Sequence, residues 1–103
     1  MHSTDAQMVV LTVLADGPRH GYAINTAIEE LTGRRLGPGS LYGALTRLEG
    51  RGLIEPVAAD ADAQDRQRTM RITETGRAAL RTELEQLARV ARAGLRALGV
   101  EQA

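Results

Sequence analysis

The sequence predicts a mainly α-helical chain with one small β hairpin, and three observations lead to this prediction. Apolar residues follow a helical spacing over most of the chain, short alternating segments occur only between residues 53 and 72, and the last segment carries one long leucine stripe. Apolar residues at i, i+4 and i+7 share one face of a helix, whereas strict alternation is typical of a strand. At 103 residues the chain is long enough for one domain with an extension.

The composition excludes several classes of protein. The chain has no cysteine, which excludes disulfides and thiol chemistry, and no group of residues has the spacing of metal ligands. We therefore expect a non-enzymatic protein without metal or cofactor. There is no N-terminal signal-like run and no stretch of roughly 18 apolar residues, so we expect a soluble, cytoplasmic protein. All 13 basic residues are arginine, which suits phosphate and guanine recognition but also follows from GC-rich codons.

The first predicted helix spans residues 5–15 and is apolar nearly all round. A helix of this kind is buried on more than one side, so we expect part of it to contact a partner, through Val9, Val10 and Val13. Asp16, Gly17 and Pro18 end the helix with a turn.

The second predicted helix runs from His20 to residue 31 or 32. Its apolar stripe consists of Ile24, Ile28 and Leu31, and Gly33 follows as a typical helix terminator. Residues 34–36 are long enough for only a single strand rung.

The third predicted helix, residues 38–51, has two unlike faces. Leu41, Leu45 and Leu48 form a stripe that must be buried, while the opposite face carries mainly small residues and one arginine: Gly39, Gly43, Thr46, Arg47 and Gly50. Each glycine inside a helix costs about 1 kcal/mol relative to alanine. Such a cost indicates that something approaches this face closely, either a DNA major groove or another helix.

A hairpin follows Gly52. Residues 53–57 form a short strand, which Pro56 places at a sheet edge, residues 58–65 form a solvated tip, and residues 66–72 return with Met70 and Ile72 on one side.

The last helix is predicted for residues 74–98, with Thr73 as its cap. Its seam steps by three or four residues through Leu80, Leu84, Leu87, Ala91, Leu95 and Leu98. At about 37 Å this helix must project beyond a body made of residues 1–73, so we assign residues 74–103 to a dimerisation helix and tail. The alternative is that the seam packs only on the first helix of its own chain.

This order of elements is that of a winged helix-turn-helix, in which the third helix enters the major groove and the hairpin reaches the neighbouring backbone. Helix 38–51 and the wing, residues 57–70, are therefore the predicted DNA-binding elements. Asp60, Asp62 and Asp65 would be repelled by phosphates, so we expect the wing to contact DNA through Arg66, Gln67 and Arg68 instead.

Four sequence blocks resemble the PadR-type transcriptional regulators in their short C-terminal form. The blocks are LADGPRHGYAI at residues 14–24, GSLYGALTRLE at 39–49, GLIE at 52–55 and RITETGR at 71–77. The resemblance implies a dimeric winged-helix repressor that binds pseudo-palindromic promoter sites. It also places His20, Tyr22, Ser40, Tyr42 and Arg47 near DNA. The chain departs from the family pattern at Gly43, where proline is common, at Met70 or Arg71, where tyrosine is common, and in having no tryptophan to hold a flat effector.

We therefore predict a sequence-specific DNA-binding regulator that acts as a homodimer on double-stranded DNA. The predicted DNA contacts are His20, Tyr22, Gly39, Ser40, Tyr42, Thr46, Arg47, Arg66, Gln67 and Arg68. Thr46 and Arg47 would read bases, with the alternative that Arg47 is only solvated. The predicted dimer contacts are Val9, Val10, Val13, Leu84, Leu87, Ala91, Leu95 and Leu98. A small aliphatic effector would lie at the dimer interface, in the space between the first and last helices, which we expect to be lined by valine, leucine and alanine.

The zero formal net charge and the acidic wing tip keep a second function open. In that alternative, the winged helix is a protein-interaction adaptor or antirepressor that does not bind DNA.

Overall fold

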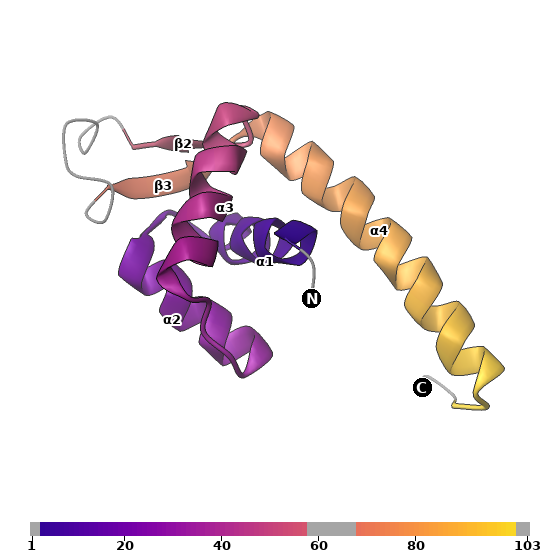
Figure 1. Cartoon of the computed structure of the whole chain (residues 1–103). Helices are drawn as coiled ribbons and strands as arrows, with labels where there is room; N and C mark the ends of the chain where they lie inside the picture. The colour runs from indigo at the N-terminus through magenta and orange to yellow at the C-terminus, as the bar shows by residue number, and fades with distance from the viewer. Residues whose placement is uncertain (1–2, 58–67, 101–103) are drawn as a thin grey trace.

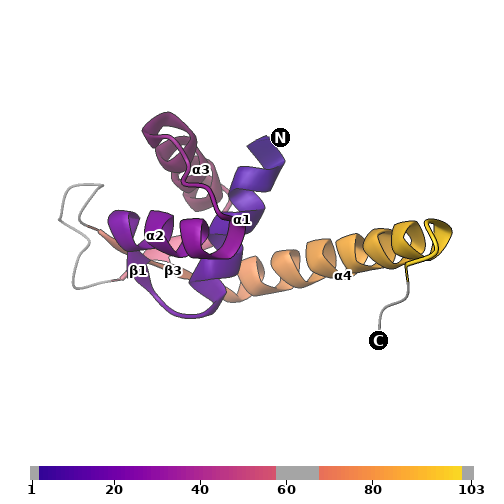
Figure 2. The ribbon, with the colours of Figure 1, turned by 90° about the horizontal axis from the view of Figure 1, so that it is seen from below.

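The computed structural model describes residues 3–57 and 68–100. Its elements, in order, are α1 (Ser3–Ala15), β1 (Arg19–His20), α2 (Gly21–Thr32), α3 (Pro38–Gly50), β2 (Ile54–Pro56), β3 (Thr69–Ile72) and α4 (Glu74–Ala97). Helices α1, α2 and α3 pack together beside the small sheet, and α4 extends away from them (Figures 1 and 2). No helix within the described ranges is long and apolar enough to cross a membrane.

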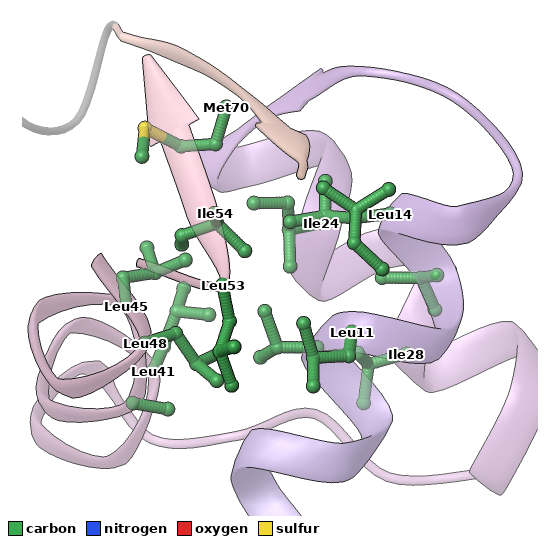
Figure 3. Close-up of a cluster of buried hydrophobic side chains, with 14 of the residues drawn as sticks. Leu11, Leu14, Ile24, Ile28, Leu41, Leu45, Leu48, Leu53, Ile54 and Met70 are labelled. Atoms are coloured by element: carbon green, nitrogen blue, oxygen red, sulfur yellow. The ribbon is translucent and has the colours of Figure 1, made fainter. Parts of the chain in front are cut away.

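The core lies where α1, α2, α3 and the sheet meet. Leu14, Ile24, Leu48 and Ile54, one from each of these elements, are at most 2% exposed, and their side chains converge in Figure 3. Burial of a complete leucine or isoleucine side chain contributes about 1.5–3 kcal/mol. This single cluster therefore holds α3 in a fixed place on the body.

Helix α1 is the central helix of the protomer, because it contacts α2, α3, α4 and β3. Val10 is fully buried and Val13 is 6% exposed, both inside the protomer's own core. The prediction that these two valines contact a partner chain is therefore wrong. The all-round apolar character of α1 reflects four neighbours from the same chain. Val9 is half-buried.

The sheet has three antiparallel strands in the order β1-β3-β2. Pro56 lies on an edge strand, and Met70 and Ile72 are buried while Arg71 is exposed, as predicted. The predicted strand rung at residues 34–36 is wrong, because the third strand is β1, where Arg19 pairs with Met70 and His20 with Thr69.

The segment between α2 and α3 is held by a side chain instead of by a strand. Asn25 Nδ2 donates to the Leu36 carbonyl and Asn25 Oδ1 accepts from the Leu36 amide, both at 2.8 Å. Since these bonds satisfy both backbone polar groups of Leu36, the segment needs no strand partner.

The last turn of α2 also differs from the prediction, since Leu31 is 57% exposed whereas Ile28 is buried.

A compact joint connects α4 to the body. Thr73 Oγ1 accepts from the Gly76 amide at 3.0 Å, which confirms the predicted cap, and it donates to the Gly52 carbonyl at 2.7 Å. Gly76 lies so close to the Leu53 carbonyl that a Cβ atom would overlap it. The glycine thus permits close packing against the chain that follows α3.

Beyond Leu80 the leucine seam of α4 has little cover. Leu80 is 5% exposed, but Leu84, Leu87 and Leu98 are 40%, 44% and 80% exposed. The alternative in which the seam packs only on α1 is therefore wrong for most of its length. The molecule measures 52 × 26 × 22 Å, and α4 accounts for the long dimension (Figure 1).

Candidate nucleic-acid interface

The outward face of α3 is open. A Cβ atom built on Gly39 or Gly50 would meet nothing within 4 Å, and one on Gly43 would meet only the side chain of Arg47, at 3.1 Å from Nη1. The leucine face is filled in the opposite way, with Leu41, Leu45 and Leu48 all buried. The glycines of α3 therefore pack on no other helix of the protomer, and the alternative that they serve such packing fails within one chain.

Thr46 and Arg47 stand on this open face, and both side chains are exposed. The Arg47 guanidinium lies over Gly43. Within the described ranges, no acidic group forms an ion pair with Arg47. The side chain therefore presents a full set of N–H donors to whatever approaches α3.

His20 is the N-cap of α2. Its Nδ1 accepts from the Ala23 amide at 3.4 Å, and its side chain is exposed. Because Nδ1 is the acceptor, the proton of the neutral ring lies on Nε2, which faces away from this hydrogen bond. His20 can thus cap α2 and donate outward at the same time.

The two tyrosines flank a hollow between the starts of α2 and α3. Tyr42 is half-buried and covers Gly21, where a Cβ atom would lie 3.0 Å from the tyrosine Oη. Tyr22 is 71% exposed, and the Arg35 guanidinium carbon lies 5.4 Å from the centre of its ring. The hollow has a volume of about 350 Å³, and its walls are Gly21, Tyr22, Asn25, Arg35, Pro38, Leu41 and Tyr42.

Arg68, a predicted DNA contact on the wing, is engaged with α3. Its Nη2 lies 2.8 Å from Glu49 Oε1 and its Nη1 lies 3.4 Å from Oε2, and the arginine side chain is only 20% exposed. A partly buried pair of this geometry ties the residue that precedes β3 to α3. Two other predicted wing contacts, Arg66 and Gln67, and the acidic tip lie outside the described residues.

A second cavity lies between α1 and α4 within one chain, whereas the sequence predicts an effector between these helices at the dimer interface. It holds about 240 Å³ and is lined by Gln7, Met8, Leu11, Arg51, Leu53, Ala79, Leu80 and Glu83. The expected aliphatic lining of valine, leucine and alanine is therefore incomplete. Arg51 Nη1 donates to Gln7 Oε1 at 2.7 Å, so one side of the cavity is polar.

Sequence reasoning gave no role to Asn25 and Arg35, which shape the interface around α2. Asn25 had a recognisable signal, because a single amide beside the apolar stripe of Ile24 and Ile28 indicates a buried hydrogen-bonding role. Arg35 had no such signal in the sequence, because its contacts are with Glu29 and Tyr22, which lie six and thirteen positions away in the chain.

The architecture defines the class of protein: three packed helices, a three-stranded antiparallel sheet and a long C-terminal helix make a winged-helix fold with an appended helix. The chain belongs to the PadR-like family of transcriptional regulators, whose family model matches residues 10–82. The membership confirms the resemblance seen in the four sequence blocks.

Several known proteins are similar to this chain. Over 90 residues, or 87% of the chain, the sequence is 53% identical to an uncharacterised 37.1 kDa protein in transposon Tn4556 of Streptomyces fradiae, and it spans 25% of that protein's length. RosR of H. salinarum is 32% identical, with a TM-score of 0.67 over 80% of this chain and 71% of that one. A PadR family regulator from Clostridium difficile, 21% identical with a TM-score of 0.72 over 90% and 96% of the two chains, shares the fold.

Proposed function

We propose that this regulator is a sequence-specific repressor that binds a pseudo-palindromic promoter site as a cytoplasmic homodimer. The observation that carries the proposal is the open face of α3, where Gly39, Gly43 and Gly50 meet no other element. A major groove about 12 Å wide admits one helix, and a helix with a bare face can approach the base edges most closely. The family membership supports this interpretation.

Thr46 and Arg47 are the proposed base readers. The Arg47 fork matches guanine O6 and N7, and such a bidentate contact contributes about 1–3 kcal/mol of discrimination. His20, Tyr22, Gly39, Ser40 and Tyr42 are the proposed backbone contacts, because they lie at the starts of α2 and α3. Arg66, Gln67 and Arg68 remain proposed contacts of the wing, although Arg68 must share its guanidinium with Glu49.

The exposed seam of α4 supports the homodimer. Leu84, Leu87 and Leu98 retain large exposed fractions in the isolated protomer, and a second copy of the same stripe is their simplest cover. Ala91 and Leu95 lie along the same seam, and Val9 completes the proposed contact. A dimer would present two copies of α3 to half-sites about one helical turn, roughly 34 Å, apart.

Arg47→Ala tests the base readout directly. We expect its affinity for the promoter fragment to fall by about 5- to 150-fold, measured by gel shift, with no change in the mass measured by light scattering. Arg89→Ala on α4 is the matched control, because it removes the same charge far from α3. If Arg47→Ala protects the same DNA bases as wild type at the same protein concentration, Arg47 does not read bases.

A protein-interaction adaptor is the second candidate function. Within the described ranges, Arg35, Arg68 and Arg71 each pair with a glutamate, so these three arginines add little net positive charge to the surface. Binding to DNA depends steeply on salt because phosphate contacts release counterions. A protein that gives no salt-dependent shift of its own promoter fragment at low salt would favour the adaptor.

We also propose that the cavity between α1 and α4 accepts a small aliphatic effector, with any polar end toward Arg51 and Gln7. The cavity volume of about 240 Å³ fits a chain of moderate length. Octanoate should raise the Tm of wild type in a thermal scan. The same ligand should have no effect on Ala79→Leu, in which the added side chain fills the cavity.

A further inference from the structure

We propose that the hollow between α2 and α3 binds one phosphate of the DNA backbone together with its sugar, with Arg35 as the phosphate ligand. The inference rests on the proposed DNA-binding function and adds a contact outside α3 and the wing. Four observations support it. They are the two hydrogen bonds from Asn25 to the Leu36 main chain, the ion pair of Arg35, the two tyrosines in the walls of the hollow, and the position of the hollow beside the open face of α3.

The first observation is that the main chain beside Arg35 is held in place. Asn25 is 9% exposed and makes two hydrogen bonds of 2.8 Å to the amide and carbonyl of Leu36. Because both bonds come from one buried side chain, residue 36 cannot move without leaving buried polar groups unpaired. Arg35 therefore projects from a fixed point at the edge of the hollow.

The second observation is that the Arg35 side chain is already oriented. Nη1 lies 2.8 Å from Glu29 Oε1, and the guanidinium carbon lies 5.4 Å from the centre of the Tyr22 ring. The pair with Glu29 engages one of the five N–H donors of arginine. Arg35 can thus bind a phosphate with its other donors, and it needs little reordering to do so.

The third observation concerns the walls. Tyr22 and Tyr42 flank the hollow, and Pro38 and Leu41 add apolar surface. A sugar-phosphate unit has the matching chemistry, because its phosphate accepts hydrogen bonds from guanidinium and phenol groups while the deoxyribose packs against apolar and aromatic surface. The volume of about 350 Å³ is ample for this unit.

The fourth observation is position. The hollow has walls from the first turns of both α2 and α3, and the open face of α3 begins at Gly39. A duplex whose major groove receives α3 therefore brings one of its strands past the mouth of the hollow.

Glu29 gains a role in this arrangement. Its carboxylate orients Arg35 in the free protein, but it also places a negative charge beside the incoming phosphate. The side chains of Arg35 and Glu29 are 37% and 49% exposed, so their pairing is weak. Glu29→Gln should therefore tighten DNA binding by about two- to fivefold.

The test is a set of duplexes of the promoter site, each with one neutral methylphosphonate in place of a phosphate. One position should weaken the binding of wild type by about tenfold or more, because a charge-assisted hydrogen bond is lost. Arg35→Ala should bind the unmodified duplex about tenfold more weakly and be insensitive to that one methylphosphonate. Its slope of log affinity against log salt should be smaller by about 0.9.

Arg71→Ala and Glu55→Gln are the matched controls. Arg71 pairs with Glu55 at 2.9 Å, with both side chains about half exposed, on the sheet face that points away from the core. Neither variant should change the affinity, the salt slope or the response to any methylphosphonate. Circular dichroism of each variant checks that the fold is retained, and Glu29→Gln gives an independent result because it should bind more tightly.

The outcomes separate this inference from the proposed function. If wild type binds the promoter while Arg35→Ala shows the same methylphosphonate profile and salt slope, the phosphate contact of Arg35 is wrong and DNA binding stands. If wild type binds no promoter fragment at low salt, both proposals fail together.

Discussion

Helices α3 and α4 both carry a leucine stripe, but they bury it in different ways. In α3 the residues Leu41, Leu45 and Leu48 all lie in the core, and the other face is nearly bare. In α4 only Leu80 is buried, whereas Leu84 and Leu87 remain 40% and 44% exposed. Helix α3 thus completes its burial within one chain, while α4 leaves part of its apolar stripe uncovered.

The two helices thus present two different kinds of surface, and we proposed a separate function for each. The surface of α3 can be identified in the sequence by its small residues, because a solvated helix face would favour long polar residues there. The surface of α4 can be identified by apolar side chains that no other part of the chain buries. Variants in the two stripes should therefore change different properties, namely protomer stability in α3 and association in α4.

The largest effect is expected at Leu48, which is fully buried. Leu48→Ala should lower the free energy of unfolding by about 2–5 kcal/mol, since it removes buried methyl groups and leaves a cavity. Chemical denaturation at fixed protein concentration measures this change. Leu31→Ala, at an exposed position of α2, is the control and should have little effect.

Association should respond most to the seam of α4. The double variant Leu84→Ala, Leu87→Ala should weaken the homodimer by about 10- to 100-fold, because partly exposed leucines contribute less than complete burial does. Light scattering over a dilution series measures the change. A wild-type protein that is monomeric at micromolar concentration would contradict the dimer and, with it, the paired half-sites.

Gly76→Ala should act on the joint between the two regions. The new Cβ atom would overlap the Leu53 carbonyl, so either α4 or the chain after α3 must shift, at a cost of about 1–3 kcal/mol. Thermal unfolding measures the loss. Gly94→Ala is the matched control, because a Cβ atom there meets nothing within 4 Å.

The smallest effect on stability is expected at Gly43. Gly43→Ala should stabilise the protein by up to about 1 kcal/mol, because alanine favours the helix and the new Cβ atom meets only the flexible end of Arg47. Its affinity for DNA should nevertheless fall, since the added methyl group separates α3 from the base edges. Unchanged DNA affinity would show that Gly43 is not needed for close approach.

The sequence predicts those features of the fold that depend on local spacing. The buried stripe of α3, the edge position of Pro56 and the cap formed by Thr73 all follow from neighbouring residues, and the structure confirms them. Strand β1 could not be predicted, because two residues form a strand only through pairing with β3, about fifty positions away.

The candidate site was predictable to a similar extent. The exposure of Thr46 and Arg47 follows from the helical period of α3, as predicted. The Arg68–Glu49 ion pair and the hydrogen bond from Asn25 to the Leu36 carbonyl could not be predicted, because only the tertiary fold brings these groups together. For the same reason, the apolar pattern of α1 shows that Val10 and Val13 are buried but not which chain buries them.

The joint at Thr73 has a mechanical consequence. The threonine holds the Gly52 carbonyl and the Gly76 amide at once, and the Thr73 amide donates to the Leu53 carbonyl at 3.0 Å. Helix α4 is therefore a rigid arm of about 36 Å whose first turn is fixed to the chain that follows α3. A difference of about 5° in its direction at this joint would move the far end by about 3 Å at that length. In the proposed dimer, the angle between two such arms sets the distance between the two copies of α3.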